Sequence, residues 1–203
     1  MQKNIALLFT TLAAVAMAAP IEKRSDDVQC KVAYTGNLQV WMNKPDQTSG
    51  PLISDGKIAP YGESMLLYDE KSQQFPKVNF VQCNLSGDIQ DEDENTIYGR
   101  IELVGQEDMC IEHLPTDDPK KQALGVQNCD KNTKSKSDKQ AFKSYLDGES
   151  DHLNLSVMDK DMETIYSQWR SMENGDNAVL TLSNSRVSFG KRNILRVANI
   201  QKK

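Results

Sequence analysis

The chain has 203 residues, with 24 Lys and Arg against 29 Asp and Glu, which gives a net charge of −5. This length suffices for one domain with a substantial core, and a charged fraction of 26% is ordinary for a folded soluble protein. Binding to nucleic-acid phosphates needs concentrated Lys and Arg, so the acidic balance argues against nucleic acid as the main partner.

The N-terminus combines a short basic start with an apolar run. Met1–Asn4 contains a lysine, Ile5–Ala16 is apolar, and Ala16–Ala18 has the small-x-small pattern that a signal peptidase cleaves. The apolar run is shorter than the ~20 residues that a membrane span requires. We therefore predict that residues 1–18 are a signal peptide and that the chain is secreted. No later stretch is apolar enough to predict membrane insertion.

A dibasic pair follows the predicted cleavage site. Residues 19–24 end in Lys23 and Arg24 on a polar segment, an arrangement that resembles the processing sites of fungal secreted proteins. We expect 19–24 to be a short pro-segment and 25–203 to be the mature protein, forming a single β-rich domain without a linker.

All four cysteines lie in the predicted mature region. An even count in an exported chain indicates two disulfides, with three connectivities open. Cys110 and Cys129 enclose a short loop and are the natural pair, which leaves Cys30 to Cys83. A structural metal site would need Cys-x-x-Cys pairs or clustered histidines. We expect no metal and no other cofactor.

Two Asn-x-Ser sequons occur in the mature region, at Asn84 and at Asn154. On the secretory route both are candidate glycosylation sites. The sequon at Asn84 directly follows Cys83, so early formation of a disulfide there would compete with its modification.

The mature chain is rich in short alternating or apolar segments separated by Gly, Asn and Asp turns. This pattern predicts an all-β fold, namely a barrel, a sandwich or a trefoil. The segments include 30–34, 38–41, 78–81, 101–104 and 179–182.

One segment has helical periodicity instead. Its apolar residues fall on one helical face, with Asp159 in the N-cap position and Asn174-Gly175 as a stop. We predict an amphipathic helix over 160–173, packed on the sheets. The face consists of Met158, Met162, Ile165, Tyr166, Trp169 and Met172.

The sequence also contains an internal similarity. Gly56–Glu63 aligns with Gly99–Gln106, and the similarity continues from Val78–Asn84 to Ala123–Asp130. The period is about 43 residues, a length typical of stacked or radially arranged units.

Four short motifs within residues 99–145 resemble one repeat of the ricin B-type β-trefoil lectins. They are Gly-x-Ile, Cys-Ile, Val-x-x-Cys and Gln140-Ala141-Phe142. The resemblance implies a β-trefoil and non-catalytic binding of glycans. It also implies sugar pockets with a carboxylate, an aromatic ring and an amide. Glu112 and Gln140 take the carboxylate and amide positions of one pocket, with Gln127 where the family usually has a ring. Asp69 and Phe80 take the carboxylate and ring positions of another pocket, which requires an exposed ring of Phe80 or Tyr68 near Asp69.

Signs of catalysis are weak. No serine lies in a Gly-x-Ser-x-Gly elbow, and the cysteines are expected in disulfides. His113 beside Glu112 and His152 beside Asp151 are expected to be surface polar pairs rather than catalytic dyads. We therefore expect no enzymatic activity. A two-carboxylate glycosidase remains an alternative, because a sequence does not reveal the separation of two acids.

Two functions follow from these features. The first is a secreted carbohydrate-binding protein, whose partners are glycans. The alternative is a secreted factor that binds another extracellular protein on the same scaffold, of effector or protease-inhibitor type. Its contacts would lie on the loops Asp88–Glu94 or Lys131–Lys139.

Overall fold

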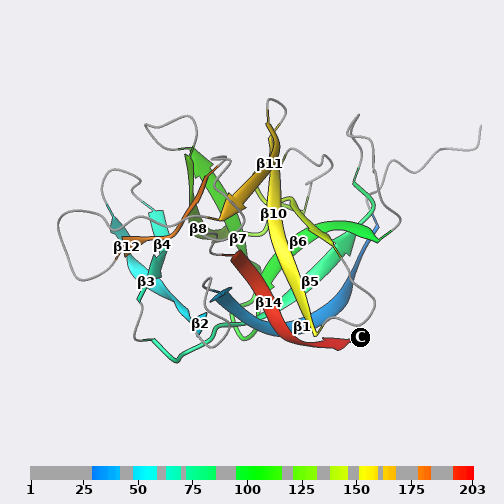
Figure 1. Cartoon of the computed structure of the whole chain (residues 1–203), viewed down its shortest axis with the longest axis horizontal. Helices are drawn as coiled ribbons and strands as arrows, with labels where there is room; N and C mark the ends of the chain where they lie inside the picture. Colours follow the sequence, from blue (N-terminus) through cyan, green and yellow to red (C-terminus); the bar gives the residue numbers. More distant parts are fainter. Residues whose placement is uncertain are drawn as a thin grey trace, which may run out of the picture.

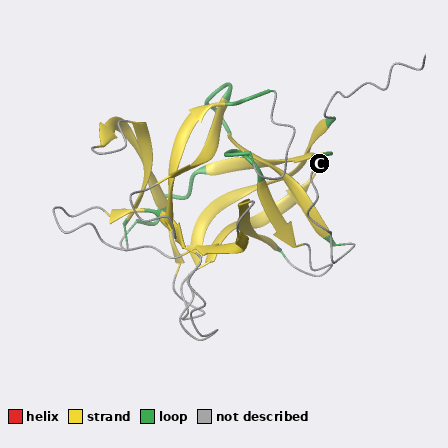
Figure 2. Cartoon of the chain, turned by 90° about the horizontal axis from the view of Figure 1, so that it is seen from above, coloured by secondary structure: helices red, strands yellow, loops and turns green. Residues whose placement is uncertain are grey.

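The structure is a computed structural model that describes residues 29–41, 48–58, 63–69, 72–85, 95–115, 121–131, 138–145, 151–159, 162–167, 178–183 and 194–203. The predicted signal peptide and pro-segment lie outside these residues. The regular secondary structure of the described residues consists of strands (Figure 2). Within this part of the chain, no helix is long and apolar enough to cross a membrane.

The strands of the described residues follow one another in short succession. They are β1 (Cys30–Trp41), β2 (Thr48–Ser49), β3 (Pro51–Ile58), β4 (Glu63–Tyr68), β5 (Lys77–Cys83), β6 (Thr96–Leu103), β7 (Met109–Pro115), β8 (Lys121–Asn128), β9 (Phe142–Tyr145), β10 (His152–Asp159), β11 (Met162–Ser167), β12 (Ala178–Val179), β13 (Thr181–Ser183) and β14 (Ile194–Lys202).

Six of these strands pair in a closed antiparallel ring and form a β-barrel. The order around the ring is β1, β5, β6, β9, β10 and β14, and β14 pairs again with β1. The short strand β9 closes the ring, because Ser144 pairs with Ile97 of β6 and with Leu155 of β10. Figure 1 shows β10, β14, β1 and β5 as neighbouring strands of this barrel.

Three further pairs of strands lie outside the ring. β3 pairs with β4, β7 with β8, and β11 with β13, and β8 joins the three pairs by contacting both β4 and β13. Backbone hydrogen bonds connect their centres: Leu124 N donates to Leu180 O, and Leu180 N donates to Leu66 O. All three leucines are fully buried. The three hairpins therefore meet around one apolar point.

The barrel core follows from the period of two along each strand. Alternate residues point to opposite faces of a sheet, and here the inward positions are apolar. Together they form one continuous cluster with the hairpin leucines. The inward residues include Leu38 and Val40 of β1, Val78 and Phe80 of β5, Ile101 and Leu103 of β6, Leu153, Leu155 and Val157 of β10, and Leu195 and Val197 of β14.

The helix predicted over 160–173 is wrong where the structure describes this segment, because Met162–Ser167 is strand β11. Ile165 pairs with Val157 of β10, and Tyr166 pairs with Ser183 of β13. The run Thr-Ile-Tyr in this strand consists of β-branched and aromatic residues, which favour strands. Pairing with two neighbours therefore outweighs the helical spacing of the apolar residues. The remainder of the predicted helix lies outside the described residues.

The internal similarity, with its period of about 43 residues, does not align strands that have the same position in the fold. It places β3 against β6 and β5 against β8. However, β5 and β6 are barrel strands, whereas β3 and β8 belong to the outer hairpins. Short Gly-x-Ile and apolar patterns occur in both kinds of strand. The internal alignment therefore matched each strand to the one that precedes its true counterpart in the fold.

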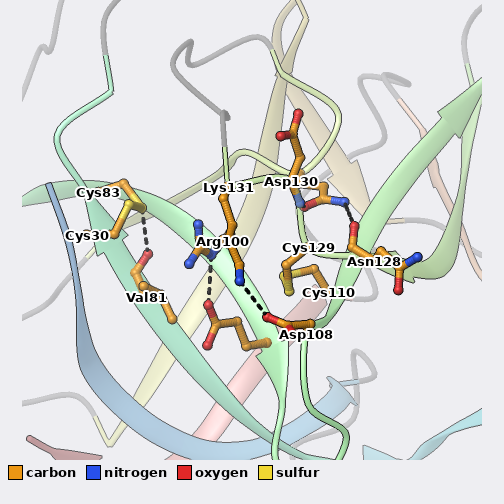
Figure 3. Close-up of polar contacts among 12 residues, drawn as sticks. Cys30, Val81, Cys83, Arg100, Asp108, Cys110, Asn128, Cys129, Asp130 and Lys131 are labelled. Carbon is orange, nitrogen blue, oxygen red and sulfur yellow. Dashed lines mark hydrogen bonds and ion pairs between the residues drawn. A yellow bond between two sulfur atoms is a disulfide. The ribbon is translucent and has the colours of Figure 1, made fainter. Parts of the chain in front are cut away.

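Both predicted disulfides are present. Cys30 is bonded to Cys83, which lies directly opposite it on the neighbouring strand, and Cys110 is bonded to Cys129 (Figure 3). The first disulfide joins β1 to β5 in the barrel. The second joins β7 to the residue that follows β8. Two disulfides are consistent with an oxidising compartment.

Candidate functional site

The side chain of Gln140 connects three segments that are distant in sequence. Its Nε2 donates to Glu112 Oε2 at 3.0 Å and to the carbonyl oxygen of Asn128 at 2.9 Å, and its Oε1 accepts from the backbone N of Asp130 at 2.8 Å. Gln140 is 3% exposed. Both hydrogens of its amide nitrogen are used, so the side chain is held in one orientation and fixes the carboxylate of Glu112.

Glu112 lies on β7 with one carboxylate oxygen committed to Gln140. The other oxygen, Oε1, is 3.8 Å from Nζ of Lys139, and the Glu112 side chain is 15% exposed against 63% for Lys139. Asn128, the last residue of β8, and Asp130 are exposed, and their backbones are hydrogen-bonded to the same Gln140 side chain. The structure therefore brings the predicted carboxylate and amide together and adds a cation that the sequence motifs did not assign. The carboxylate of Glu112 can accept a hydrogen bond from a hydroxyl-bearing ligand, and the ammonium group of Lys139 can donate one to it.

His113 is not a surface residue, which corrects the expectation from the sequence. It is 6% exposed, and its ring meets Phe142 edge-on at 6.4 Å between centroids. Its Nε2 donates to the carbonyl oxygen of Asp138 at 3.0 Å, and its backbone N donates to that of Lys139 at 2.8 Å. The histidine thus anchors the turn that carries Lys139 and Gln140, which is a structural role.

His152 and Asp151 do form a polar pair at the surface. Nδ1 of His152 is 3.0 Å from Oδ1 of Asp151, whose side chain is 80% exposed. This hydrogen bond from His152 holds the pKa of Asp151 below its usual range.

The second predicted pocket, formed by Asp69 and Phe80, is not assembled as expected. Phe80 is fully buried in the barrel core, so its ring cannot stack on a ligand at the surface. Asp69 directly follows β4, and its backbone carbonyl accepts hydrogen bonds from the hydroxyl of Ser49 and from the backbone N of Ser72. The internal similarity caused this error, because it aligned β5, the barrel strand that carries Phe80, with β8, a strand of an outer hairpin.

One cluster of potential metal ligands occurs among the described residues. It consists of Glu102, Cys110 and Cys129, with ligand atoms within 4.8 Å of one another. The two sulfurs are bonded to each other, whereas a metal needs free thiolates. Glu102 is also held by Arg100, with 2.8 Å between Nε and Oε1. With the disulfide intact, this cluster is not suited to a metal ion.

Both sequon asparagines are exposed. Asn84 directly follows β5, and its backbone N donates to the carbonyl oxygen of Gln29 at 3.0 Å. A cavity of about 440 Å³ lies next to it and is lined in part by Cys30, Cys83 and Tyr98. Asn154 lies within β10, on the face opposite the core.

No protein-family model matches the chain, and no curated protein matches it.

Replacing Gln140 with alanine is expected to lower the free energy of unfolding by about 1–3 kcal/mol, because the Asp130 N–H and the Glu112 carboxylate each lose a partner. Urea denaturation followed by tryptophan fluorescence measures this loss. Gln140→Glu is the matched variant: it places a second carboxylate against Glu112, so its deficit should shrink as the pH falls and one carboxyl is protonated. A change below about 0.5 kcal/mol for Gln140→Ala would contradict the anchoring role.

Proposed function

We propose that this protein is a secreted, non-catalytic carbohydrate-binding protein built on a β-trefoil of the ricin B type. The arrangement of strands supports this fold: a six-stranded barrel carries three hairpins that meet at Leu66, Leu124 and Leu180. Each hairpin lies in sequence between two barrel strands. Three similar units around one axis are what a trefoil requires.

A repeated glycine pattern further supports the trefoil. Gly36 precedes the inward residues Leu38 and Val40 of β1, and Gly99 similarly precedes two inward residues of β6. A Cβ at Gly36 would lie 2.6 Å from the carbonyl oxygen of Ala198, and a Cβ at Gly99 would clash with the carbonyl oxygen of Val81. Both glycines therefore allow a neighbouring barrel strand to approach closely.

The contact between Glu112 and Gln140 carries the functional proposal. The ricin B-type resemblance implies that a carboxylate and an amide from these two motifs belong to one sugar pocket. In the structure they are hydrogen-bonded at 3.0 Å, although they are 28 positions apart in the chain. The other carboxylate oxygen, Oε1, lies 3.8 Å from Nζ of Lys139, and the same Gln140 side chain binds the backbone of the exposed Asn128 and Asp130.

We propose that Oε1 of Glu112 accepts a hydrogen bond from a sugar hydroxyl and that Lys139 donates to a neighbouring hydroxyl. Gln140 positions the carboxylate and does not itself contact the sugar, because its amide is already used. Gln127 replaces the usual aromatic ring, so stacking contributes little here. We expect a single sugar to bind weakly, with Kd on the order of 1 mM, and higher affinity to require larger glycans.

A glycan array probed with the disulfide-intact chain 25–203 tests the proposal. Glu112→Gln retains an oxygen that accepts from Gln140 but loses the charge that attracts the sugar hydroxyl. We expect it to weaken binding about tenfold, which is the loss of one hydrogen bond to a charged group. Glu102→Gln is the matched control, because Glu102 is also a paired carboxylate, held by Arg100 instead of by Gln140. Equal binding by wild type and Glu112→Gln would contradict the assignment.

One observation favours the alternative, a secreted factor that binds another protein. Burial of Phe80 removes the ring assigned to the second predicted sugar pocket, and the side chain of Tyr68, the alternative ring, lies outside the described residues. The loop Asp88–Glu94 and most of Lys131–Lys139, which would carry such contacts, lie outside the described residues. A folded protein that binds no glycan on the array would support this alternative.

A further inference from the structure

An exposed aromatic ring lies directly opposite a sequon. Tyr145 of β9 and Asn154 of β10 are paired in the antiparallel register, and Tyr145 is 47% exposed. Directly opposite side chains point to the same face, with Cβ atoms about 5 Å apart. Covering the exposed part of this ring with an apolar surface is favourable.

The strand presents both functional residues of the sequon on that same face. Asn154 and Ser156 alternate with the buried Leu153, Leu155 and Val157, so both point away from the core. Asn154 is exposed, whereas the hydroxyl of Ser156 donates to the carbonyl oxygen of Lys143 at 3.3 Å. Folding thus leaves the asparagine at the surface next to the ring.

The residue that pairs with Asn154 on its other side, Arg196, makes its side-chain contacts with β1. Arg196 of β14 pairs with Asn154, but its Nε and Nη2 donate to Gln39 Oε1 at 3.4 Å and 3.3 Å. Its guanidinium also lies over the ring of Trp41, 6.0 Å from the centroid. The guanidinium is therefore directed toward β1, away from Tyr145 and its strand β9.

We propose that Asn154 carries an N-linked glycan and that Tyr145 packs against its first sugar. In this modification the side-chain nitrogen of Asn154 bonds to the anomeric carbon of a sugar supplied by a lipid pyrophosphate-linked oligosaccharide. The bond from that carbon to the pyrophosphate breaks, and the nitrogen loses one proton. The apolar face of the sugar then covers the ring of Tyr145, as aromatic rings favour.

This inference rests on the proposed secretion of the chain but not on sugar binding at Glu112. The two sequons differ in their surroundings, which provides an internal control. Asn84 is followed by the buried Leu85 and lies beside the disulfide of Cys83. Strand β6 separates Asn84 from Tyr145, whereas Asn154 is the direct partner of Tyr145, so a glycan at Asn84 is expected to interact less with this ring.

The test begins with secretion of the full chain from a eukaryotic host and mass spectrometry of the peptide containing Asn154. We expect this peptide to carry a glycan that Asn154→Gln removes. Tyr145→Thr, which retains a strand-favouring residue, is then combined with Asn154→Gln in a double-mutant cycle of urea unfolding. We expect a coupling of about three- to tenfold in the unfolding equilibrium constant, as for stacked rings.

The cycle of Tyr145→Thr with Asn84→Gln is the control and should show clearly weaker coupling. A secreted, folded protein with unmodified Asn154 would overturn the inference while leaving secretion intact. A glycan at Asn154 without coupling to Tyr145 would overturn the packing role. Retention of the chain inside the host without any glycan would overturn the proposed secretion together with this inference.

Discussion

Replacing Phe80 with alanine is expected to lower the free energy of unfolding by about 3–5 kcal/mol, because the ring is fully buried in the barrel core. Phe80 lies on β5 between Tyr34 of β1 and Ile101 of β6, so its removal leaves a cavity beside two neighbouring strands. Small domains are stable by only about 5–15 kcal/mol, so this variant should lose a large part of its stability. Urea denaturation of the disulfide-intact protein measures the change.

Phe80→Leu tests whether the ring of Phe80 packs in the core or contacts a glycan. It retains most of the apolar volume, so we expect a smaller loss of about 1–2 kcal/mol and unchanged binding of glycans. If Phe80→Ala were as stable as the wild type but lost glycan binding, the ring would be a surface contact. That outcome would contradict its burial.

Removal of the Cys30–Cys83 disulfide has the second large expected effect. The two cysteines are 53 residues apart in sequence, and chain entropy predicts a stabilisation of about 4 kcal/mol for a loop of this length. Cys30→Ala combined with Cys83→Ala leaves no unpaired thiol. Because the bond joins β1 to β5, we expect the loss to appear as a lower midpoint of thermal unfolding, measured by circular dichroism.

The matched control is the pair Cys110→Ala and Cys129→Ala. These cysteines are 19 residues apart, for which the same treatment predicts about 3 kcal/mol. Both double variants should therefore melt at lower temperature than the wild type, with the longer loop more affected. A Cys30/Cys83 variant whose melting point is within about 1 °C of the wild type would contradict a stabilising role for this bond.

The strand content and both disulfides could be predicted from the sequence. Alternating apolar residues such as Ile101 and Leu103 follow the strand period, and the pairing of Cys110 with Cys129 follows from their proximity in the chain. These two signals are local and need no knowledge of the three-dimensional neighbours, and the pairing of Cys30 with Cys83 then follows by elimination. The predictions based on them agree with the structure.

Features that depend on distant neighbours were predicted less well. The apolar residues of Met162–Ser167 have helical spacing, yet β10 and β13 supply strand partners. The internal similarity confused barrel strands with hairpin strands, which placed Phe80 in a surface pocket. His113 looked like a surface residue because its neighbour Glu112 is polar, but β7 turns its ring toward Phe142.

The candidate site was predicted in part. The motif resemblance assigned Glu112 and Gln140 to one pocket, and the structure joins these two residues by a hydrogen bond. The contribution of Lys139 was not assigned, since its ammonium lies near Glu112 only because the turn at 138–140 is fastened by His113. Such a position follows from tertiary contacts and leaves no periodic signal in the sequence.

The most direct measurement is a nuclear magnetic resonance titration of the disulfide-intact, ¹⁵N-labelled chain 25–203. Galactose, mannose and N-acetylglucosamine are each added to about 50 mM, a concentration suited to Kd values on the order of 1 mM. We predict that one of these sugars causes saturable shifts of the Gln140 side-chain amide and of the backbone amides of Asp130 and Lys139. Absence of shifts at these three residues with all three sugars, or shifts confined to another face, would contradict sugar binding at Glu112.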